Sequence, residues 1–361
     1  MEAPTGGRVT IDLDALASNW RLLRDRGAPA ECGAVVKADA YGCGIERVVP
    51  VLARSGCRTF FTALPAEAAK VRKAAPHASI YVLNGLFDAA TWFAQNNVRP
   101  VAGTLPDVER LRGTGQPFAL HVDTGMTRLG LTVAEARKLD TSGLRIEMVM
   151  THFACADDVD HPKTDSQREQ LVQIAKRFPG ARISVSNSAA ILQGGDNRID
   201  LVRPGIAMYG AEALNDVENP MRPVVTLEGR VVQVREAKRG DTVGYGATVT
   251  LTRKSRIAIV SVGYADGYHR SASGSGVPMR HERKGAHGFL RGRNVPVLGR
   301  VSMDLTAFDV TDVPGAVQGD WIEMFGANVA VDDVARACGT IGYELLTGLG
   351  NRYRRTYIDA S

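Results

Sequence analysis

A lysine stands at the end of a short apolar run in the stretch GAVVKADAYGCG, residues 33–44. The run predicts a buried strand, so Lys37 at its end would be partly desolvated. Desolvation disfavours the ammonium ion and lowers the pKa of the amine. A neutral amine can attack an aldehyde and form a Schiff base. The alternative is a solvated charge at a strand end, and position alone leaves both open.

Two later stretches have the residue types of an anion-binding site. In SVSNSAAIL a strand is followed by Asn187 and Ser188 and then by a helix-like run, which predicts Ser188 as the helix cap. Free backbone N–H groups at a helix N-terminus bind anions such as phosphate. In LVRPGIAMYG, Gly205 lets the backbone approach a ligand closely. Ser188 could equally be an ordinary cap with no ligand.

Three further polar residues follow predicted strands. Arg128 in HVDTGMTRLG can hold a carboxylate in bidentate fashion, or make a surface ion pair. His152 in MTHFACAD can stack on a planar ligand, or lie half-buried with its hydrogen bonds satisfied. Tyr264 in VGYADGY can act as a base if nearby cations lower its pKa from about 10, or pack as a strand-end aromatic. No one of these residues assigns a function by itself.

The first two thirds of the chain alternate strand-like and helix-like stretches. The apolar, β-branched runs are residues 33–38, 59–63, 79–83, 99–102, 118–123, 146–152, 182–186 and 201–202. Helical periodicity marks residues 13–24, 105–112, 132–139 and 165–178. Thr164 and Gln167 match a capping box before the last of these. The alternation predicts an α/β fold, a TIM-like (β/α)8 barrel over residues 1–225, with a doubly wound open sheet as the alternative.

The pattern changes near Pro223. Stretches such as VTLEGRVVQVREAKRGDTVGYGATVT alternate apolar and polar residues between Gly and Asp turns. This is typical of antiparallel strands, so a mainly antiparallel β domain is predicted over residues 226–361, with a short helix near 332–337.

Composition excludes several classes of protein. The chain has 361 residues, 44% hydrophobic and 23% charged, which suits one large globular domain and a smaller one. The net charge of +5 is small against 44 basic and 39 acidic residues, and no basic stripe indicates nucleic-acid binding. No run approaches the roughly 20 apolar residues of a membrane span, and no secretory leader is visible.

The cysteines and histidines indicate a compartment and argue against a metal. The 5 cysteines form no CxxC pair, which suits free thiols in a reducing cytoplasm. The 7 histidines show no ligand spacing such as HExxH, so no metal is expected.

Together these stretches resemble the bacterial alanine racemase family, pyridoxal-phosphate enzymes of the barrel fold type. The match runs nearly end to end, and the family's segments occur in order as AVVKADAYGCG, HVDTGMTRLG, THFACAD, NSAA, RPGIAMYG, VGYGATVT, VGYADGY and GRVSMD. The resemblance implies pyridoxal 5'-phosphate as cofactor and interconversion of L-alanine and D-alanine, supplying D-alanine for peptidoglycan. It also implies a homodimer with the active site shared between subunits, and neither a nucleic-acid nor a membrane partner.

The resemblance implies two bases on opposite faces of the substrate. Lys37 resembles the lysine that binds the cofactor and serves as one base. Tyr264 resembles the second base, which enters from the partner subunit. Racemisation removes the α proton from one face and returns one to the other, which two such bases achieve. Arg128 and Met303, the latter through its backbone N–H, resemble the substrate-carboxylate site.

The other implied contacts are with the cofactor. Tyr41, Ser188, Gly205 and Ile206 resemble the phosphate ligands, and Asn187 is assigned to the same cofactor site. Arg203 resembles the arginine that faces the pyridine nitrogen, and His152 resembles the histidine packed near the ring.

The chain departs from the family pattern around the site. His121 stands where the family often has a lysine modified to a carbamate, which a histidine cannot form. Ser184 replaces a histidine that would support Arg203, and Ser302 stands where many members have cysteine. Asn351 lies near the register of a C-terminal tyrosine that often reaches the phosphate. Both predicted bases are retained.

Other hypotheses share parts of this plan. A serine racemase or one of broad specificity would keep Lys37 and Tyr264, and the pocket lining near Tyr343 would decide between them. Pyridoxal-phosphate-dependent amino-acid decarboxylases share the two-domain plan but lack a tyrosine base in this context. A carrier protein for the cofactor would need the barrel alone.

Overall fold

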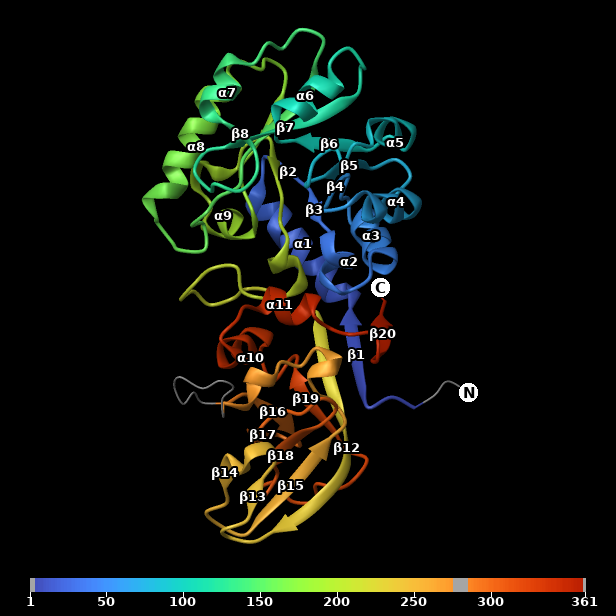
Figure 1. The fold of residues 1–361 in the computed structure, drawn as a ribbon, viewed down its shortest axis with the longest axis vertical. Coiled ribbons are helices and arrows are strands. Elements are labelled where there is room, and N and C mark those ends of the chain that lie inside the picture. The colour runs from blue at the N-terminus through green and yellow to red at the C-terminus, as the bar shows by residue number, and fades with distance from the viewer. Residues whose placement is uncertain (1–3, 275–284, 360–361) are drawn as a thin grey trace. The chain divides into compact units, whose positions relative to one another are not determined.

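The computed structural model describes residues 4–274 and 285–359. The chain divides into two compact units, and Figure 1 labels most of their helices and strands. The first, here the barrel unit, is Leu16–Met221. The second, here the β unit, comprises the residues up to Ala15 together with those from Arg222 onward.

The barrel unit, all of whose residues the structure describes, is a ring of eight parallel strands. Pairing runs in the order β3-β4-β5-β6-β7-β9-β10, and β11 pairs with β2. Gly33 separates β2 from β3, so these two form one strand position. The Arg203 N–H donates to the Ser186 carbonyl at 2.9 Å, which joins the ends of β11 and β10 and closes the ring. The predicted barrel is confirmed, and the open sheet is wrong.

Most strands lie where the apolar, β-branched runs predict them. The predicted run at residues 33–38 ends as a strand at Val35, and a short strand forms at residues 131–132, where none is predicted. Their bounds are β2 (Glu31–Cys32), β3 (Ala34–Val35), β4 (Thr59–Thr62), β5 (Ser79–Val82), β6 (Arg99–Ala102), β7 (Pro117–Asp123), β8 (Leu131–Thr132), β9 (Arg145–Met150), β10 (Arg182–Ser184) and β11 (Leu201–Val202). Most ring strands are buried on both faces, as parallel strands covered by helices must be.

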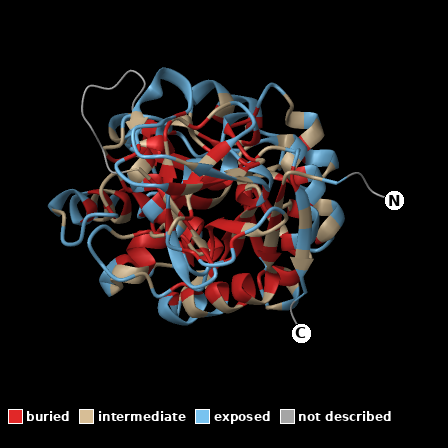
Figure 2. Ribbon diagram, turned by 90° about the horizontal axis from the view of Figure 1, so that it is seen from below, coloured by how far each residue is buried: buried red, intermediate tan, exposed pale blue. Residues whose placement is uncertain are grey.

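Helices connect the strands and cover the ring. They are α1 (Leu13–Gly27), α2 (Lys37–Tyr41), α3 (Ile45–Arg54), α4 (Pro65–Ala74), α5 (Ala90–Gln95), α6 (Leu105–Leu111), α7 (Val133–Lys138), α8 (Pro162–Ala175), α9 (Ser188–Gln193) and the 3-10 turns η1 (Gly195–Asn197) and η2 (Ile206–Tyr209). Helix α1 buries Leu16, Trp20 and Leu23, and the Trp20 indole donates to the Gly33 carbonyl at 3.1 Å. Figure 2 colours the residues by burial, and shows the buried residues in the interior and the exposed residues on loops and outer helix faces.

The predicted start of the helix near residues 165–178 is corrected by the structure. Helix α8 begins at Pro162, and its cap is His161, whose side chain accepts the Lys163 N–H at 3.2 Å. The capping box of Thr164 and Gln167 is therefore wrong, because both lie inside the helix.

In the described part of the β unit, six strands close into a second ring. The order is β12-β15-β18-β17-β16-β19 and back to β12, and every pairing in it is antiparallel. Strand β1 pairs antiparallel with β12, and β20 pairs parallel with β1. The antiparallel domain is confirmed. Strand β1 pairs with β12, so the β unit also includes N-terminal residues that the predicted boundary between residues 225 and 226 assigns to the barrel.

The β unit contains the following elements. Its strands are β1 (Gly7–Asp12), β12 (Val225–Ala237), β13 (Thr242–Val243), β14 (Val249–Thr250), β15 (Ser255–Val260), β16 (His287–Leu290), β17 (Arg293–Leu298), β18 (Thr306–Asp309), β19 (Trp321–Phe325) and β20 (Arg354–Ile358). Its helices are α10 (Val331–Cys338), α11 (Gly342–Thr347), η3 (Tyr245–Ala247), η4 (Tyr264–Asp266) and η5 (Arg270–Ser273). The predicted helix near 332–337 is α10.

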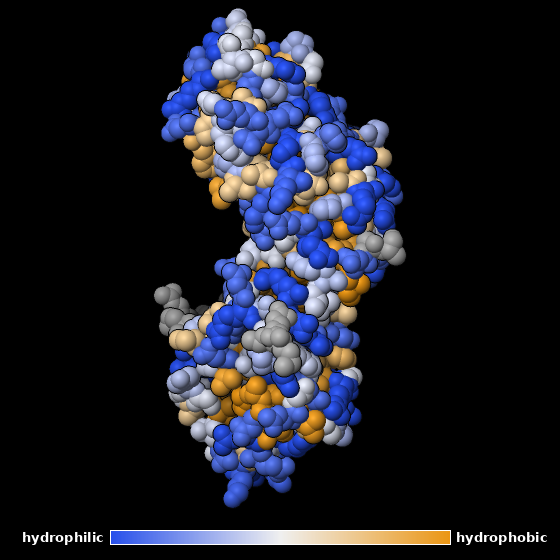
Figure 3. Space-filling view, turned by 90° about the vertical axis from the view of Figure 1, so that its right-hand side faces the viewer, coloured by the Kyte–Doolittle hydropathy of each residue, from blue (hydrophilic) through white to orange (hydrophobic). Residues whose placement is uncertain are grey.

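The surface of the described residues has two relevant features. None of their helices has the length and apolar character needed to cross a membrane. On the face shown in Figure 3, apolar residues gather in a patch on the β unit, bordered by hydrophilic residues.

Candidate active site

Lys37 begins an unusual turn directly after strand β3. The next four residues, Ala38 to Tyr41, have φ between 52° and 56°, the left-handed helical region. That conformation costs non-glycine residues roughly 1–2 kcal/mol each. The turn is held by backbone bonds from Ala40 N–H to Val36 O and from Gly42 N–H to Ala38 O, both 2.9 Å. Strain fixed in this way is concentrated at functional sites.

Lys37 is partly buried and lies near the cation of Arg128. Burial is the main cause that lowers its pKa below the ordinary lysine value, and the cation of Arg128 lowers it further. The Glu67 carboxylate opposes the shift without reversing it. The predicted desolvation of this lysine therefore has a structural basis, and more of the amine is neutral at a given pH than for a free lysine.

Tyr41 is fixed at the other end of the left-handed turn. Its ring stacks on that of Tyr209, with centroids 4.5 Å apart and an angle of 24° between the planes. The buried Tyr209 hydroxyl donates to the Val35 carbonyl at 3.0 Å. Tyr209 is a supporting residue that the sequence motifs do not single out, although it lies in the stretch LVRPGIAMYG. Its position between Gly205 and Gly210, in the same stretch as Arg203, is the signal that points to it.

The predicted anion-binding residues come together beside Tyr41. The Ser188 hydroxyl accepts the N–H groups of Gly205 at 2.8 Å and Ala207 at 3.4 Å. A Cβ on Gly205 would lie 2.5 Å from the Tyr41 hydroxyl, so the two groups are in close contact. The Ile206 N–H has no hydrogen-bond partner among residues 4–274 and 285–359. This group of residues can surround a small anion.

Asn187, not Ser188, caps helix α9. The Asn187 side chain accepts the Ala190 N–H at 3.0 Å, and Ser188 is the first helical residue. The predicted cap is thus displaced by one position. The shift leaves the Ser188 hydroxyl to bind the backbone near Gly205.

Arg203 is a fully buried cation without a carboxylate partner among the described residues. Its guanidinium donates to the Ser184 hydroxyl, to the Thr151 carbonyl at 2.7 Å and to the Val185 carbonyl at 3.4 Å. Burial lowers its pKa to about 10, which still leaves it charged at neutral pH. Ser184, which replaces the expected histidine, therefore still supports Arg203.

His152 follows strand β9 and is held by its neighbours. Gln167 accepts the Ala154 N–H at 2.9 Å and donates to the His152 carbonyl at 3.0 Å. Burial first, and then the cations Arg203 and Arg128, lower the pKa of His152 to about 3. The imidazole is thus neutral throughout the physiological range. Gln167, which matches a capping-box position in the sequence, thus supports the backbone of the His152 segment instead.

Arg128 is presented by a turn after strand β7. The Asp123 carboxylate accepts the N–H groups of Gly125, Met126 and Thr127 at 2.9, 2.8 and 3.1 Å. Among the described residues no carboxylate pairs with Arg128.

His121 lies nearby at the end of β7. Burial, followed by the cations Arg203 and Arg128, lowers the pKa of His121 to about 4. A neutral His121 supplies no negative charge, so Arg128 retains its full attraction for an anion from outside the chain.

Tyr264 and Met303 form a second group, in the β unit. The Tyr264 N–H donates to Ser302 O and the Ala265 N–H to Met303 O, both at 3.0 Å. The Tyr264 side chain is 42% exposed and Met303 is 55% exposed. Within the described ranges the Met303 N–H has no hydrogen-bond partner. A phenol and a free N–H donor are thus presented on two adjoining turns.

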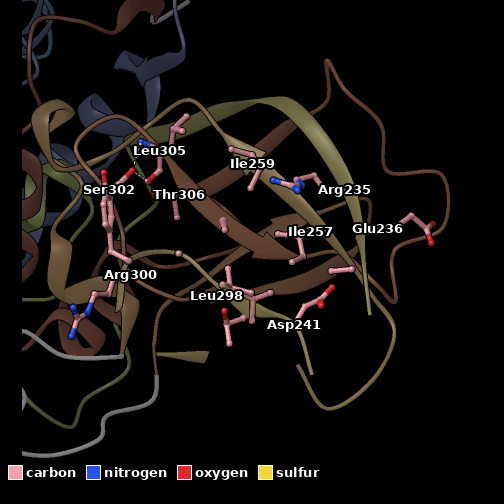
Figure 4. A pocket seen from close by; sticks show the side chains of 16 residues that line it. Arg235, Glu236, Asp241, Ile257, Ile259, Leu298, Arg300, Ser302, Leu305 and Thr306 are labelled. Atoms are coloured by element: carbon pink, nitrogen blue, oxygen red, sulfur yellow. Dashed lines mark hydrogen bonds between the residues drawn. The ribbon is translucent and has the colours of Figure 1, made fainter. Parts of the chain in front are cut away.

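A cavity of about 780 Å³ opens on the β unit (Figure 4). Its walls carry Ile257 and Leu298 from strands β15 and β17, with Arg300 and Ser302 at one end. The predicted site residues Tyr264 and Met303 do not line it. All five cysteines are free, and the described residues contain no group of three acidic, histidine or cysteine side chains able to hold a metal.

A parallel barrel with a partly buried lysine at a strand end and a buried arginine, followed by an antiparallel β unit, defines a two-domain class of protein. The family model "Alanine racemase, N-terminal domain" matches residues 11–213, and "Alanine racemase, C-terminal domain" matches residues 224–357. The chain therefore belongs to the alanine racemase family.

Individual relatives agree over nearly the full length. "Alanine racemase, biosynthetic" of Agrobacterium fabrum is 50% identical, covering 98% of this chain and 94% of that protein. "Alanine racemase, catabolic" of the same organism is 39% identical, covering 98% and 92%. The crystal structure of alanine racemase from Bartonella henselae with covalently bound pyridoxal phosphate superposes with a TM-score of 0.90 at 34% identity, covering 98% of this chain and 100% of that one.

Proposed function

We propose that this protein is an alanine racemase that uses pyridoxal 5'-phosphate to interconvert L-alanine and D-alanine. The observation that carries the proposal is the environment of Lys37. Lys37 follows a barrel strand, and the pKa of its amine is lowered. The same barrel unit also contains the buried Arg203 and the contact between Ser188 and Gly205. The covalently bound cofactor of the Bartonella relative supports the same assignment.

The residues of the barrel unit fit the cofactor. Lys37 would hold it covalently, and Tyr41, Ser188, Gly205 and Ile206 would bind its phosphate. The free Ile206 N–H and the close contact of Gly205 with the Tyr41 hydroxyl support a phosphate at this place, since it needs donors and a backbone without side chains.

Three further residues complete the proposed cofactor site. Arg203, a buried cation with no carboxylate partner in the described chain, would face the ring nitrogen, and the neutral His152 would pack near the ring. Asn187 would support the site through its cap on helix α9. When bound, pyridoxal phosphate acidifies the α proton of the amino acid joined to it by delocalising the carbanion.

Two bases would then move the proton. Lys37 and Tyr264 would act on opposite faces of the α carbon, each removing the proton in one direction of the reaction and returning it in the other. The lowered pKa of Lys37 makes its neutral, basic form available. Arg128 and the free Met303 N–H would bind the substrate carboxylate, and both lack a competing partner among the described residues.

The division of roles between the units follows from these assignments. Residues 1–225 would bind the cofactor, and residues 226–361 would supply the second base. Tyr264 would enter the site of a second copy, so the protein would act as a homodimer. The exposure of Tyr264 and Met303 and the apolar patch of the β unit support a covering partner. The five free thiols favour the cytoplasm, where D-alanine would be made for peptidoglycan.

A labelling experiment tests the assignment of Lys37. The protein is incubated with pyridoxal phosphate, reduced with borohydride and digested, and the modified peptide is identified by mass. The label should appear on Lys37 and not on Lys70, whose ammonium lies 3.5 Å from Asp39 in the same unit. A label on Lys70 alone, or none, refutes the cofactor site.

A substitution tests the second base. Tyr264→Phe should retain bound cofactor, because Tyr264 is not among the proposed cofactor contacts, and should lose racemisation of alanine. Full racemisation of alanine by this variant contradicts the two-base assignment, and racemisation of serine in preference to alanine by the unaltered protein redirects the substrate.

A further inference from the structure

The turn that carries Tyr264 is fastened to the turn that carries Met303. Besides the two backbone bonds between them, the Gly263 backbone touches the second turn directly. A Cβ on Gly263 would lie 2.3 Å from Ser302 O and 2.4 Å from Met303 O, so only glycine permits this approach. The phenol and the free Met303 N–H are therefore placed relative to each other by the contact between two short turns.

The second turn is itself closed by a side chain. The Ser302 hydroxyl donates to Leu305 O at 2.9 Å and accepts the Leu305 N–H at 3.2 Å, as Figure 4 shows. The Ser302 N–H also donates to Leu305 O at 2.9 Å. Met303 and Asp304 are thus held at the tip of a closed four-residue turn.

Asp266 closes the first turn and is nearly buried. One of its carboxylate oxygens accepts the Gly263 N–H at 2.9 Å. Its other oxygen lies 3.2 Å from Nε of Arg352, and its backbone carbonyl accepts the Gly350 N–H at 3.0 Å. The segment around Arg352, just before strand β20, therefore packs directly against the Tyr264 turn.

Arg352 reaches the second turn with its other end. Nη2 of Arg352 lies 2.9 Å from a carboxylate oxygen of Asp304, while Nε faces Asp266. The planar guanidinium presents donors in two fixed directions, which a lysine cannot do. One side chain thus joins the acidic residue that closes the Tyr264 turn to the residue next to Met303.

We infer that Arg352 is a positioning residue that fixes Tyr264 relative to Met303 by bridging Asp266 and Asp304. The inference rests on the proposed function for its catalytic meaning. The Arg352 and Asp304 side chains are half-exposed, and ion pairs of that kind add little to global stability. Their contribution here is geometric, because a displacement of about 1 Å at a reacting group costs as much as 100-fold in rate.

The first readout is independent of activity. Hydrogen exchange of the Tyr264 and Ala265 amides reports whether the turns stay joined, since both amides donate across the contact. In Arg352→Met both amides should exchange at least 10-fold faster. The matched control is Arg253→Met, which removes an ion pair with Asp312 of similar exposure in the same unit and should leave both rates unchanged.

The second readout is the primary deuterium isotope effect on kcat/KM, measured separately with α-deuterated L-alanine and D-alanine. A displaced Tyr264 slows one of the two proton transfers. The isotope effect should therefore rise for the enantiomer whose proton Tyr264 removes and fall towards unity for the other, with kcat/KM about 10- to 100-fold lower in both directions. A loss of folded protein would lower rates and leave both isotope effects as they were.

Two more variants complete the test. Asp304→Asn breaks the same bridge from its other end and should reproduce both signatures, and Arg352→Lys should restore them only in part. Unchanged amide exchange in Arg352→Met and Asp304→Asn overturns the positioning role, as do equal changes in Arg253→Met. Should Arg352→Met fail to fold, Asp304→Asn decides alone. Faster exchange in a protein that does not racemise alanine would uphold the bridge and reject the proposed function.

Discussion

A methyl group added at Gly205 would strike the Tyr41 hydroxyl. The Cβ of an alanine at this position would lie 2.5 Å from the Tyr41 oxygen and 3.3 Å from the ring carbon that bears it. Tyr41 cannot simply turn aside, because its ring stacks on Tyr209 at 4.5 Å. Overpacking of this kind costs about 1–3 kcal/mol. Gly205→Ala should therefore lower the free energy of unfolding of the cofactor-free protein by about 2 kcal/mol.

A double-mutant cycle isolates the clash. Tyr41→Phe removes the oxygen and leaves the ring carbon at 3.3 Å as the nearest atom of that side chain. In the Tyr41→Phe background, the decrease in the free energy of unfolding caused by Gly205→Ala should be about 1 kcal/mol smaller than in the unaltered protein. A coupling of this size is typical of residues in contact.

The assay is urea unfolding of the four proteins at one protein concentration without cofactor. If the unfolding free-energy changes of the two single variants sum to that of the double variant within about 0.5 kcal/mol, the contact between Gly205 and Tyr41 is refuted, because independent sites behave that way. The affinity for pyridoxal phosphate should fall in both single variants, since each alters the proposed phosphate site.

Three other predictions concern buried groups. The pKa of His152 is lowered to about 3, so its NMR chemical shifts should stay constant between pH 5 and 9, and a titration near pH 6.5 would show that the buried site is wrong. Ser184→Ala removes a hydroxyl that accepts a hydrogen bond from Arg203, so the free energy of unfolding should fall by about 1–3 kcal/mol and cofactor binding should weaken. An unchanged free energy of unfolding would contradict the contact between Ser184 and Arg203. The hydroxyls of Tyr268 and Tyr353 are buried without partners among the described residues, so replacing either by Phe should leave thermal stability equal or higher, and a clear loss would reveal an unseen partner.

The strand and helix pattern was predictable because barrel strands are short apolar runs. The segments before Lys37 and Arg128 have that pattern, and both side chains follow the strand ends where they were expected. The first strand, Gly7–Asp12, lies within residues 1–225, which the prediction assigned to the barrel because they come first in the chain. Its partner β12 is more than 200 residues away, and no local pattern specifies such a pairing.

The details of the site depended on long-range contacts that spacing does not specify. Thr164 and Gln167 match a capping box, yet Pro162 starts the helix earlier and Gln167 instead holds the backbone at His152. The left-handed turn after Lys37 contains three residues of ordinary type before Tyr41, so nothing in its composition predicts it. Tertiary contacts decide such positions.

The most direct test of the central claim is polarimetry of alanine with the purified protein and pyridoxal phosphate. The optical rotation of L-alanine should decay to zero, and that of D-alanine should decay to the same value from the opposite sign, because a racemase brings both to the same mixture. Lys37→Ala should abolish both decays. A rotation that stays constant for both enantiomers with the unaltered protein, measured with cofactor bound, would contradict the assignment of this chain as an alanine racemase.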